Sequence, residues 1–250
     1  HQAIIAASAG ATTSQVSGYD AELLLSHADM ALSAAKQHTG NGMELFTPEM
    51  DRRLKDRQEM DAALRQALAQ HQFTLAYQPQ VDIATGELTG AEALARWTHA
   101  TLGPMPPSAF IAAAEETGLI VELGRWALQT ACAEAANWPR EIKLAVNVSP
   151  VQFELSDVVA DVTAALESSG LEPSRLEIEI TEGIFVRDAE AMTQRLQDIR
   201  KLGVSIALDD FGTGYSSLSY LGQLPVDKIK IDKSFVRRLP GDSEAATISR

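Results

Sequence analysis

The sequence predicts an α/β protein with mainly parallel strands, either a doubly wound sheet or a (β/α) barrel. From Phe73 onward, short runs rich in Val, Ile and Leu alternate with stretches that space their apolar residues as helices do. Most of the stretches between these runs are long enough for a helical crossover, which parallel strands require. Several runs also carry polar residues near their C-terminal ends, the edge where such folds build their sites.

The N-terminal part of the chain predicts a small α+β unit followed by a linker. Its expected elements are a strand at residues 1–5, a helix over Tyr19–Gln37, a turn at residues 39–42, a strand over Met43–Phe46 and a helix over Pro48–Gln70. The last helix is long and charged on one side, which indicates a linker between two regions. Residues 1–5 and 245–250 resemble the interrupted ends of a strand and a helix, so we expect a piece of a longer protein.

The alternating part begins with two strands that should be antiparallel, because Ala84-Thr85-Gly86 between them is too short for a crossover. The expected strands cover Phe73–Val81, Leu88–Trp97, Ile142–Val148, Leu176–Thr181, Val204–Leu208 and Val226–Ile231. The expected helices cover Ser108–Glu116, Ile120–Asn137, Asp157–Ser168 and Asp188–Lys201.

The composition limits the class of protein. The 250 residues are 45% hydrophobic and 22% charged, which is typical of one large globular domain or two small ones. A net charge of −13 argues against binding a nucleic-acid polymer through its phosphates, although a small phosphate ligand could bind through metal ions. The single cysteine, Cys132, excludes an intramolecular disulfide and is expected to be a buried apolar residue. No run of residues is long and apolar enough to span a membrane.

Polar residues interrupt the apolar strands near their C-terminal ends. They are Glu92, Asn147, Glu179, Asp209 and Asp210. Parallel strands covered by helices are usually apolar on both faces, so this pattern indicates a site. All five residues offer hard oxygen ligands, which suit Mg²⁺, Mn²⁺ or Ca²⁺ and not a thiolate metal. The alternative is a structural network with lysines, but Lys230, which lies between two isoleucines, cannot alone neutralise four acids.

A loop with two glycines follows the two aspartates. Gly212 and Gly214, with small hydroxyl residues, predict a tight, mobile segment of the kind that gates an active site. The tripeptide Asp210-Phe211-Gly212 matches the magnesium motif of protein kinases. The chain lacks both the Gly-rich loop and the His-Arg-Asp loop of kinases, so we reject that class.

From about Phe73 to the end, the sequence resembles the EAL domain family. The resemblance rests on Glu92-Ala93-Leu94 with Arg96-Trp97, Asn147-Val148-Ser149, Glu179-Ile180-Thr181-Glu182, Asp209-Asp210-Phe211-Gly212-Thr213-Gly214-Tyr215-Ser216 and Lys230-Ile231-Asp232. It implies a TIM-like (β/α) barrel with one antiparallel strand, and hydrolysis of the bacterial messenger cyclic di-GMP to linear pGpG. The family has two further strands, with another metal-associated Glu and a Gln near the substrate, so the barrel should be incomplete in this chain and its catalysis weak.

The resemblance also implies a role for each site residue. Metal ligands would be Glu92, Asn147, Glu179, Asp209 and Asp210, holding two Mg²⁺ or Mn²⁺ ions, with Ca²⁺ as an inhibitor. Catalytic residues would be Lys230, which orients the attacking water, Glu182, which anchors the loop that begins at Asp210, and Asp210 itself. Contacts to the dinucleotide would come from Gln78, Leu94 and Arg96.

The N-terminal region resembles the tail of a GGDEF (diguanylate cyclase) domain. The resemblance rests on the segment from Ala28 to Lys36, in which Ser33 replaces a frequent Tyr. The family usually has an Arg near Asn41, and the cyclase signature would lie upstream, so we expect no synthesis of cyclic di-GMP. The resulting domains are a GGDEF remnant at 1–47, a linker helix at 48–72 and a truncated EAL domain at 73–250.

Three functions compete at this stage. The first is a cytoplasmic, metal-dependent phosphodiesterase for cyclic di-GMP, a homodimer through its EAL domain, with an upstream sensor domain and any membrane tether outside this chain. The second is a module that binds the dinucleotide without hydrolysis, and the third is a structural fragment. Degenerate sensors usually lose metal ligands or the loop, whereas this chain keeps every such residue that it spans, which favours the enzyme.

Overall fold

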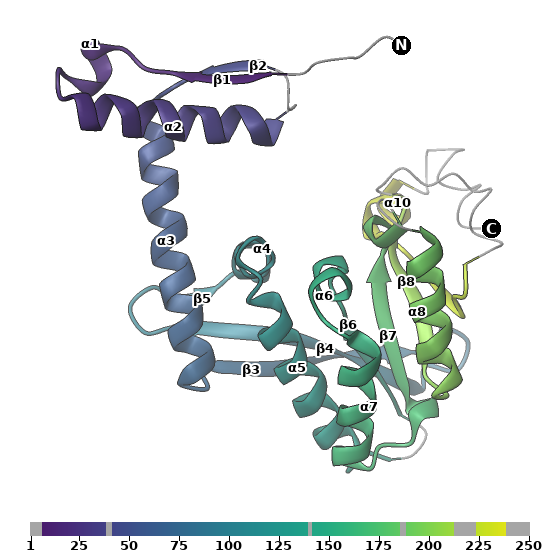
Figure 1. The fold of residues 1–250 in the computed structure, drawn as a ribbon. Coiled ribbons are helices and arrows are strands. Elements are labelled where there is room, and N and C mark those ends of the chain that lie inside the picture. Colours follow the sequence, from purple (N-terminus) through teal and green to yellow (C-terminus); the bar gives the residue numbers. More distant parts are fainter. Residues whose placement is uncertain (1–6, 39–41, 140–141, 186–188, 213–223, 239–250) are drawn as a thin grey trace, which may run out of the picture. The chain divides into compact units, whose positions relative to one another are not determined.

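The computed structural model describes residues 7–38, 42–139, 142–185, 189–212 and 224–238 (Figure 1). The chain divides into two compact units, His1–Ala63 and Leu64–Arg250. The boundary falls inside the long helix α3 (Pro48–Ala69), which agrees within one residue with the helix predicted there. The predicted assignment of the chain to a GGDEF remnant, a linker and an EAL domain stays a prediction.

The N-terminal unit is a two-stranded parallel sheet packed on a helix. Its elements are β1 (Ser8–Ala11), α1 (Ser14–Ser17), α2 (Ala21–His38), β2 (Gly42–Leu45) and the first part of α3. A Cβ on Gly10 of β1 would lie 2.0 Å from the backbone nitrogen of Leu32, so glycine is required where the strand crosses α2. The strand predicted at residues 1–5 and most of the predicted turn lie outside the described residues.

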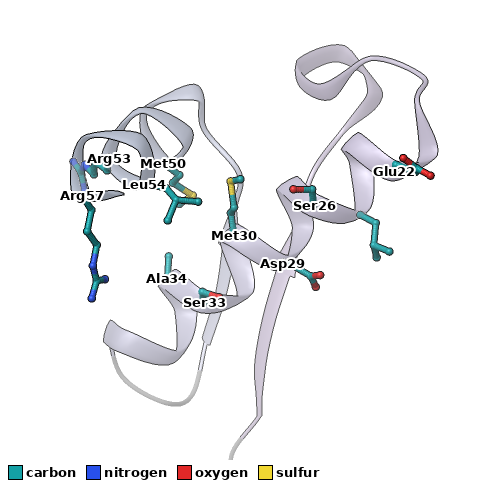
Figure 2. Close-up of a pocket in the computed structure, with 11 residues that line it drawn as sticks. Glu22, Ser26, Asp29, Met30, Ser33, Ala34, Met50, Arg53, Leu54 and Arg57 are labelled. Carbon is teal, nitrogen blue, oxygen red and sulfur yellow. The ribbon is translucent and has the colours of Figure 1, made fainter. Parts of the chain in front are cut away.

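A groove of about 710 Å³ lies between α2 and α3 of the N-terminal unit (Figure 2). Met30, Met50 and Leu54 contribute apolar lining, and Asp29 and Arg53 contribute charges. Every residue that lines it belongs to this unit, and none is a candidate site residue from the sequence.

The second unit is built on a seven-stranded mixed sheet of order β3-β4-β6-β7-β8-β9, with β5 paired to β4. The strands are β3 (Phe73–Val81), β4 (Leu88–His99), β5 (Gly103–Met105), β6 (Lys143–Asn147), β7 (Leu176–Thr181), β8 (Ser205–Phe211) and β9 (Lys228–Ile231). The β3–β4 pair is antiparallel, as predicted, and strands β4, β6, β7, β8 and β9 pair in parallel. The predicted α/β class is therefore confirmed.

The helices of this unit are α4 (Pro107–Thr117), α5 (Ile120–Ala135), α6 (Pro150–Leu155), α7 (Val158–Ser169), α8 (Ala189–Lys201) and α10 (Lys233–Arg238), with 3₁₀ turns η1 (Pro173–Arg175) and η2 (Glu182–Phe185). Helices α5, α6, α7 and α8 contribute buried residues to the core on the outer face of the sheet (Figure 1). Ile178 of β7, Leu128 of α5 and Leu196 of α8 belong to one buried core, which also contains Cys132, fully buried as predicted. Within the described residues, every helix is too short or too polar to cross a bilayer.

The inner face of the sheet is polar where the outer face is apolar. Successive residues of a strand point to opposite faces, so the isoleucines of β7 join the core while Glu177 and Glu179 point inward. The sheet curls far enough for a side chain of β9 to contact one of β3, although these two strands are not neighbours in the described sheet. This curl brings polar side chains from separate strands close together on the inner face of the sheet.

Several elements differ from the prediction. Strand β8 continues through Asp209 and Asp210, which the sequence placed beyond its end, because pairing with β7 extends to Thr181 opposite Asp209. β9 begins at Lys228 rather than Val226, and α5 ends at Ala135 rather than Asn137. Strands β1 and β5 and helices α1, α6 and α10 were not predicted. The helix end expected at residues 245–250 lies outside the described residues.

Candidate active site

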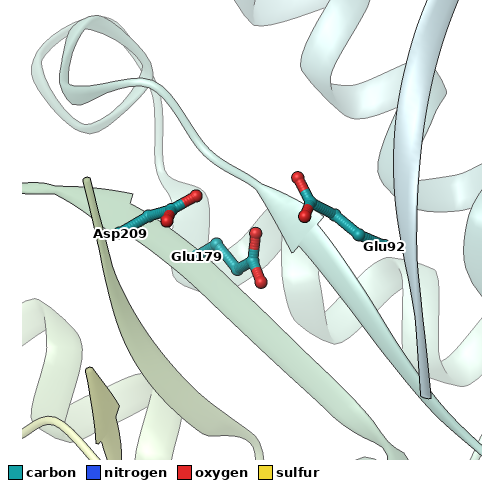
Figure 3. Close-up of side chains that lie close together, drawn as sticks. All are labelled: Glu92, Glu179 and Asp209. Carbon is teal, nitrogen blue, oxygen red and sulfur yellow. The ribbon is translucent and has the colours of Figure 1, made fainter. Parts of the chain in front are cut away.

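Three carboxylates from three strands meet on the inner face of the sheet. Glu92 of β4, Glu179 of β7 and Asp209 of β8 place one oxygen each within 4.8 Å of the others. Figure 3 shows the three side chains pointing toward one another across the strands. Their strands are not all adjacent, since β6 lies between β4 and β7, so the curl of the sheet is needed to bring them together. We call these three residues the carboxylate cluster.

The Lys230 ammonium lies inside the carboxylate cluster. Its Nζ donates to Glu179 Oε2 at 2.6 Å, Asp209 Oδ2 at 2.8 Å and Glu92 Oε2 at 3.0 Å. One positive charge therefore faces three carboxyl groups. The sequence predicted that Lys230 would reach these acids, and the structure confirms this contact.

The second oxygen of each carboxylate has a different environment. Glu92 Oε1 accepts a hydrogen bond from Asn147 Nδ2, and Asp209 Oδ1 accepts one from the backbone N–H of Asp210, both at 2.8 Å. Glu179 Oε1 is buried and has no hydrogen-bond partner among the residues that the structure describes. A buried, unpartnered carboxylate oxygen is costly unless a cation satisfies it. With hard oxygen donors around it, this atom fits a Mg²⁺, Mn²⁺ or Ca²⁺ ligand.

Burial sets the protonation of the site. It raises the pKa of Glu179 to about 7, and the charges of Glu92 and Asp209 add to this rise while Lys230 opposes it. For Lys230, burial lowers the pKa, but the hydrogen bonds that its ammonium donates to Asp209, Glu179 and Glu92 outweigh burial, and the net shift is upward. Burial and the neighbouring Asp209 raise the pKa of Asp210. Lys230 therefore stays charged, and Glu179 keeps its proton to a higher pH than an exposed glutamate does.

A bulge shapes the chain after Asp209. β8 places two residues, Asp209 and Asp210, opposite the single residue Lys230 of β9. Asp210 takes a left-handed conformation, with φ of +51°. Bulges of this kind often lie beside active sites, where they redirect a side chain. The rest of the predicted gate loop, residues 213–218, lies outside the described residues.

Glu182 contacts the segment that begins at Asp210, as predicted. Its Oε1 accepts a hydrogen bond from the backbone N–H of Gly212 at 2.8 Å. Its other carboxylate oxygen is buried, with no hydrogen-bond partner in the described part of the chain. Glu182 thus lies just past β7, where it can fix the chain after the bulge without joining the carboxylate cluster.

The expected substrate residues lie on the first two strands. Gln78 of β3 is directly opposite Glu92 of β4 and therefore shares its face. Leu94 and Arg96 follow Glu92 at alternate positions and belong to the same face. The Arg96 guanidinium donates to the carbonyl of Ala95 at 2.9 Å.

Sequence reasoning missed two groups around the site. Ser149 caps α6 and donates to Glu115 Oε1 of α4 at 2.6 Å, which ties the chain after Asn147 to the outer helices. Glu177 accepts a hydrogen bond from Lys228 at 2.8 Å on the inner face. The signal for this second pair was present, because each residue stands two positions before a predicted site residue of the same type.

The shifted pKa of Glu179 predicts how pH affects the stability of the metal-free protein. Folded Glu179 holds its proton up to about pH 7, whereas its unshifted pKa is 4.5, so the folded state binds more protons between these values. We expect the melting temperature, measured by calorimetry with a chelator, to fall as pH rises through this window. Glu179→Gln should flatten that part of the pH profile. The same slope in both proteins would contradict the assignment.

Comparison with known proteins assigns most of the chain to the family that its sequence motifs resemble. Residues 61–250 match the EAL domain. The chain is 40% identical over 252 residues to the bifunctional diguanylate cyclase/cyclic di-GMP phosphodiesterase MucR of Pseudomonas aeruginosa, covering 99% of the chain and 37% of MucR. It is 41% identical over 225 residues to the oxygen sensor protein DosP of Escherichia coli, covering 88% of the chain and 28% of DosP. The chain spans 27% to 37% of the length of the first curated relatives it matches.

Solved EAL structures share the fold. The MucR phosphodiesterase in complex with c-di-GMP superposes with a TM-score of 0.71 at 43% identity, over 76% of this chain and 78% of that one. The EAL domain of FimX from Pseudomonas aeruginosa, bound to c-di-GMP, gives 0.68 at 28% identity, over 76% and 77% of the two chains. These neighbours confirm the predicted TIM-like barrel class.

Proposed function

Because the chain belongs to the EAL domain family, we propose that the protein containing it hydrolyses cyclic di-GMP to linear pGpG with the aid of divalent metal ions. The observation that carries this proposal is the carboxylate cluster around Lys230, in which a buried oxygen of Glu179 has no hydrogen-bond partner within the described residues. The relative MucR, named as a cyclic di-GMP phosphodiesterase, supports the choice of substrate.

The cluster and its neighbours would hold two Mg²⁺ or Mn²⁺ ions. The proposed ligands are Glu92, Asn147, Glu179, Asp209 and Asp210. Bound divalent ions would supply Lewis-acid stabilisation of a phosphoryl group and lower the pKa of a water molecule. Ca²⁺ would bind to the same hard oxygens and inhibit. Asn147 donates a hydrogen bond to Glu92 through its side-chain amide, which leaves the amide oxygen of Asn147 for an ion.

Lys230 would orient the attacking water. Its ammonium stays protonated beside the carboxylates, so it donates a hydrogen bond and does not remove a proton. Glu182 would hold the chain that follows Asp210 through the amide of Gly212. Gln78, Leu94 and Arg96, on the face that carries Glu92, would contact the dinucleotide, with the Arg96 guanidinium toward its phosphates.

The proposal is tested with the full-length protein, Mg²⁺ or Mn²⁺ and cyclic di-GMP, by chromatographic detection of pGpG. Product that forms with either metal and disappears with a chelator is the expected result. Binding of cyclic di-GMP without product in any of these metals would favour the alternative, a binding module that does not hydrolyse.

Glu182→Ala should lower turnover more than affinity for cyclic di-GMP. Glu182 contacts the backbone of Gly212 and lies outside the carboxylate cluster, so its loss should misplace the chain after Asp210 while most substrate contacts remain. We expect a loss of about tenfold or more in kcat, because misplaced catalytic geometry is costly. Kinetics of pGpG formation and calorimetric binding in Ca²⁺ measure the two effects.

Glu190→Ala is the matched control for this prediction, since Glu190 is an exposed acid at the start of α8. It should leave both quantities unchanged. A wild-type rate for Glu182→Ala would show that Glu182 is an ordinary surface acid.

A further inference from the structure

A second polar layer lies beneath the carboxylate cluster on the inner face of the sheet. The Lys228 ammonium of β9 lies 2.8 Å from Glu177 Oε1 of β7 and 3.3 Å from Gln80 Oε1 of β3. The Glu177 side chain is only 7% exposed. We call Gln80, Glu177 and Lys228 the lower layer. It links the two edge strands of the described sheet through one lysine.

The lower layer repeats the site above it at a spacing of two residues. Glu177 and Lys228 each stand two positions before a site residue of the same type, Glu179 and Lys230. On the antiparallel strand β3, Gln80 stands two positions after Gln78. Alternate residues of a strand share a face and lie about 6.6 Å apart, so each lower-layer residue lies one step below a candidate site residue.

The backbone alone specifies the register of β9 weakly. This strand has four residues, and its ladder with β8 changes register at the bulge between Leu208 and Phe211. The sequence Lys228-Ile229-Lys230-Ile231 also repeats with period two. A slip of two residues would therefore keep every side chain on its proper face and would preserve the alternation of lysine and isoleucine.

The two possible slips differ in what they place on the inner face. A slip in one direction moves Lys228 into the place of Lys230 and leaves Val226 facing the buried Glu177. The opposite slip moves Asp232 among three carboxylates, which like-charge repulsion opposes. The first slip still places a lysine among the three carboxylates, so the carboxylate cluster does not select against it. What opposes this slip is Glu177, which would be buried without a cation.

We propose that Glu177 and Lys228 are positioning residues that fix the register of β9 and so place the Lys230 ammonium in the carboxylate cluster. Asp227 holds the same strand from the other side, since its carboxylate accepts from the N–H of Ile206 at 2.9 Å and from Arg200 at 2.6 Å. The lower layer supplies the contact on the inner face, where Lys228 of β9 reaches side chains of β7 and β3. Its effect on turnover rests on the proposed phosphodiesterase activity, but its effect on β9 does not.

The test uses Lys228→Met, Glu177→Gln and the double variant in the full-length protein. Lys228→Met leaves a buried carboxylate without its cation and should lower the melting temperature, whereas the double variant removes both charges and should regain most of it. The contact to Lys228 is lost in Lys228→Met and in the double variant, whereas glutamine at position 177 can still accept from the Lys228 ammonium. Hydrogen exchange of the β9 amides should therefore accelerate by about tenfold in these two variants and less in Glu177→Gln, because local opening becomes easier.

Turnover separates positioning from stability. We expect kcat for pGpG formation to fall by about tenfold in the double variant as well as in Lys228→Met, with KM little changed, because Lys230 is misplaced. Lys228→Arg, which keeps the charge, should retain wild-type exchange and turnover. Asp161→Asn, which breaks the 2.8 Å Arg125–Asp161 ion pair between α5 and α7, is the matched control and should change neither.

Two results would overturn the proposal. One is unchanged exchange of the β9 amides in Lys228→Met and in the double variant. The other is a double variant whose turnover recovers together with its melting temperature, since the pair would then be structural only. If the wild type forms no pGpG, the proposed function fails, and hydrogen exchange still decides the register by itself.

Discussion

Lys230→Met is expected to leave the full-length protein able to bind cyclic di-GMP in Ca²⁺ while hydrolysis in Mg²⁺ falls by about two orders of magnitude or more. The Lys230 ammonium donates to Glu92, Glu179 and Asp209 at 3.0 Å or less, so it is the cationic donor closest to the proposed reaction centre among the described residues. Methionine keeps most of the stem and removes the donor. Chromatography of pGpG and calorimetry of dinucleotide binding measure the two properties.

Lys201→Met is the matched control for this substitution. Lys201 lies at the end of α8, and its side chain is 68% exposed. Its ammonium forms an ion pair with Asp198 of the same helix at 2.7 Å. Its loss should leave hydrolysis unchanged, since exposed ion pairs of this kind contribute little. Near-normal pGpG formation by Lys230→Met would remove Lys230 from the catalytic group and return it to a structural ion-pair network.

Glu179→Gln is expected to weaken binding of Mn²⁺ or Mg²⁺ by about 100-fold or more, because it removes a charged oxygen ligand at the centre of the site. Glutamine has nearly the same shape, so the strand should pack as before. Glu179 is fully buried, and its Oε1 lacks a hydrogen-bond partner among the described residues, so this oxygen is open to a cation. Calorimetry without dinucleotide should be done at pH 8, where Glu179 is ionised in the wild type.

Glu167→Gln supplies the control for metal binding. Glu167 is an exposed acid on α7, in the helix layer outside the sheet. Its replacement by glutamine removes the same charge from the protein as Glu179→Gln does. A general effect of net charge would weaken binding in both variants equally. Equal affinities in Glu179→Gln and the wild type would exclude Glu179 as a ligand.

The site was predictable in outline because strand geometry is regular. Glu179 and Asp209 lie near the C-terminal ends of two parallel strands, and such ends meet at one edge of a sheet. Glu92 joins them from the part of β4 that pairs in parallel with β6, although β4 itself runs on to His99. Period-two alternation also predicted that Lys230 would point away from its isoleucine neighbours and toward the acids. Both inferences need only the order of the residues and the assumption of parallel strands.

Other features depend on contacts that the local sequence does not reveal. β1 contains small residues with little strand preference, and it is a strand because Gly10 can approach the backbone of α2. β8 extends through its bulge because β7 continues to pair with it. The capping box of α6, from Ser149 to Gln152, was visible in the sequence but lies in a helix of six residues, too short for its periodicity to stand out.

The left-handed backbone at Asp210 limits which residues evolution could place there. Among residues other than glycine, aspartate and asparagine tolerate this conformation best, because their short polar side chains form local hydrogen bonds. Of these three choices, only aspartate carries a charge. The backbone conformation therefore restricts position 210 to very few residue types. A single substitution to asparagine can remove the negative charge of this side chain while the backbone conformation stays the same.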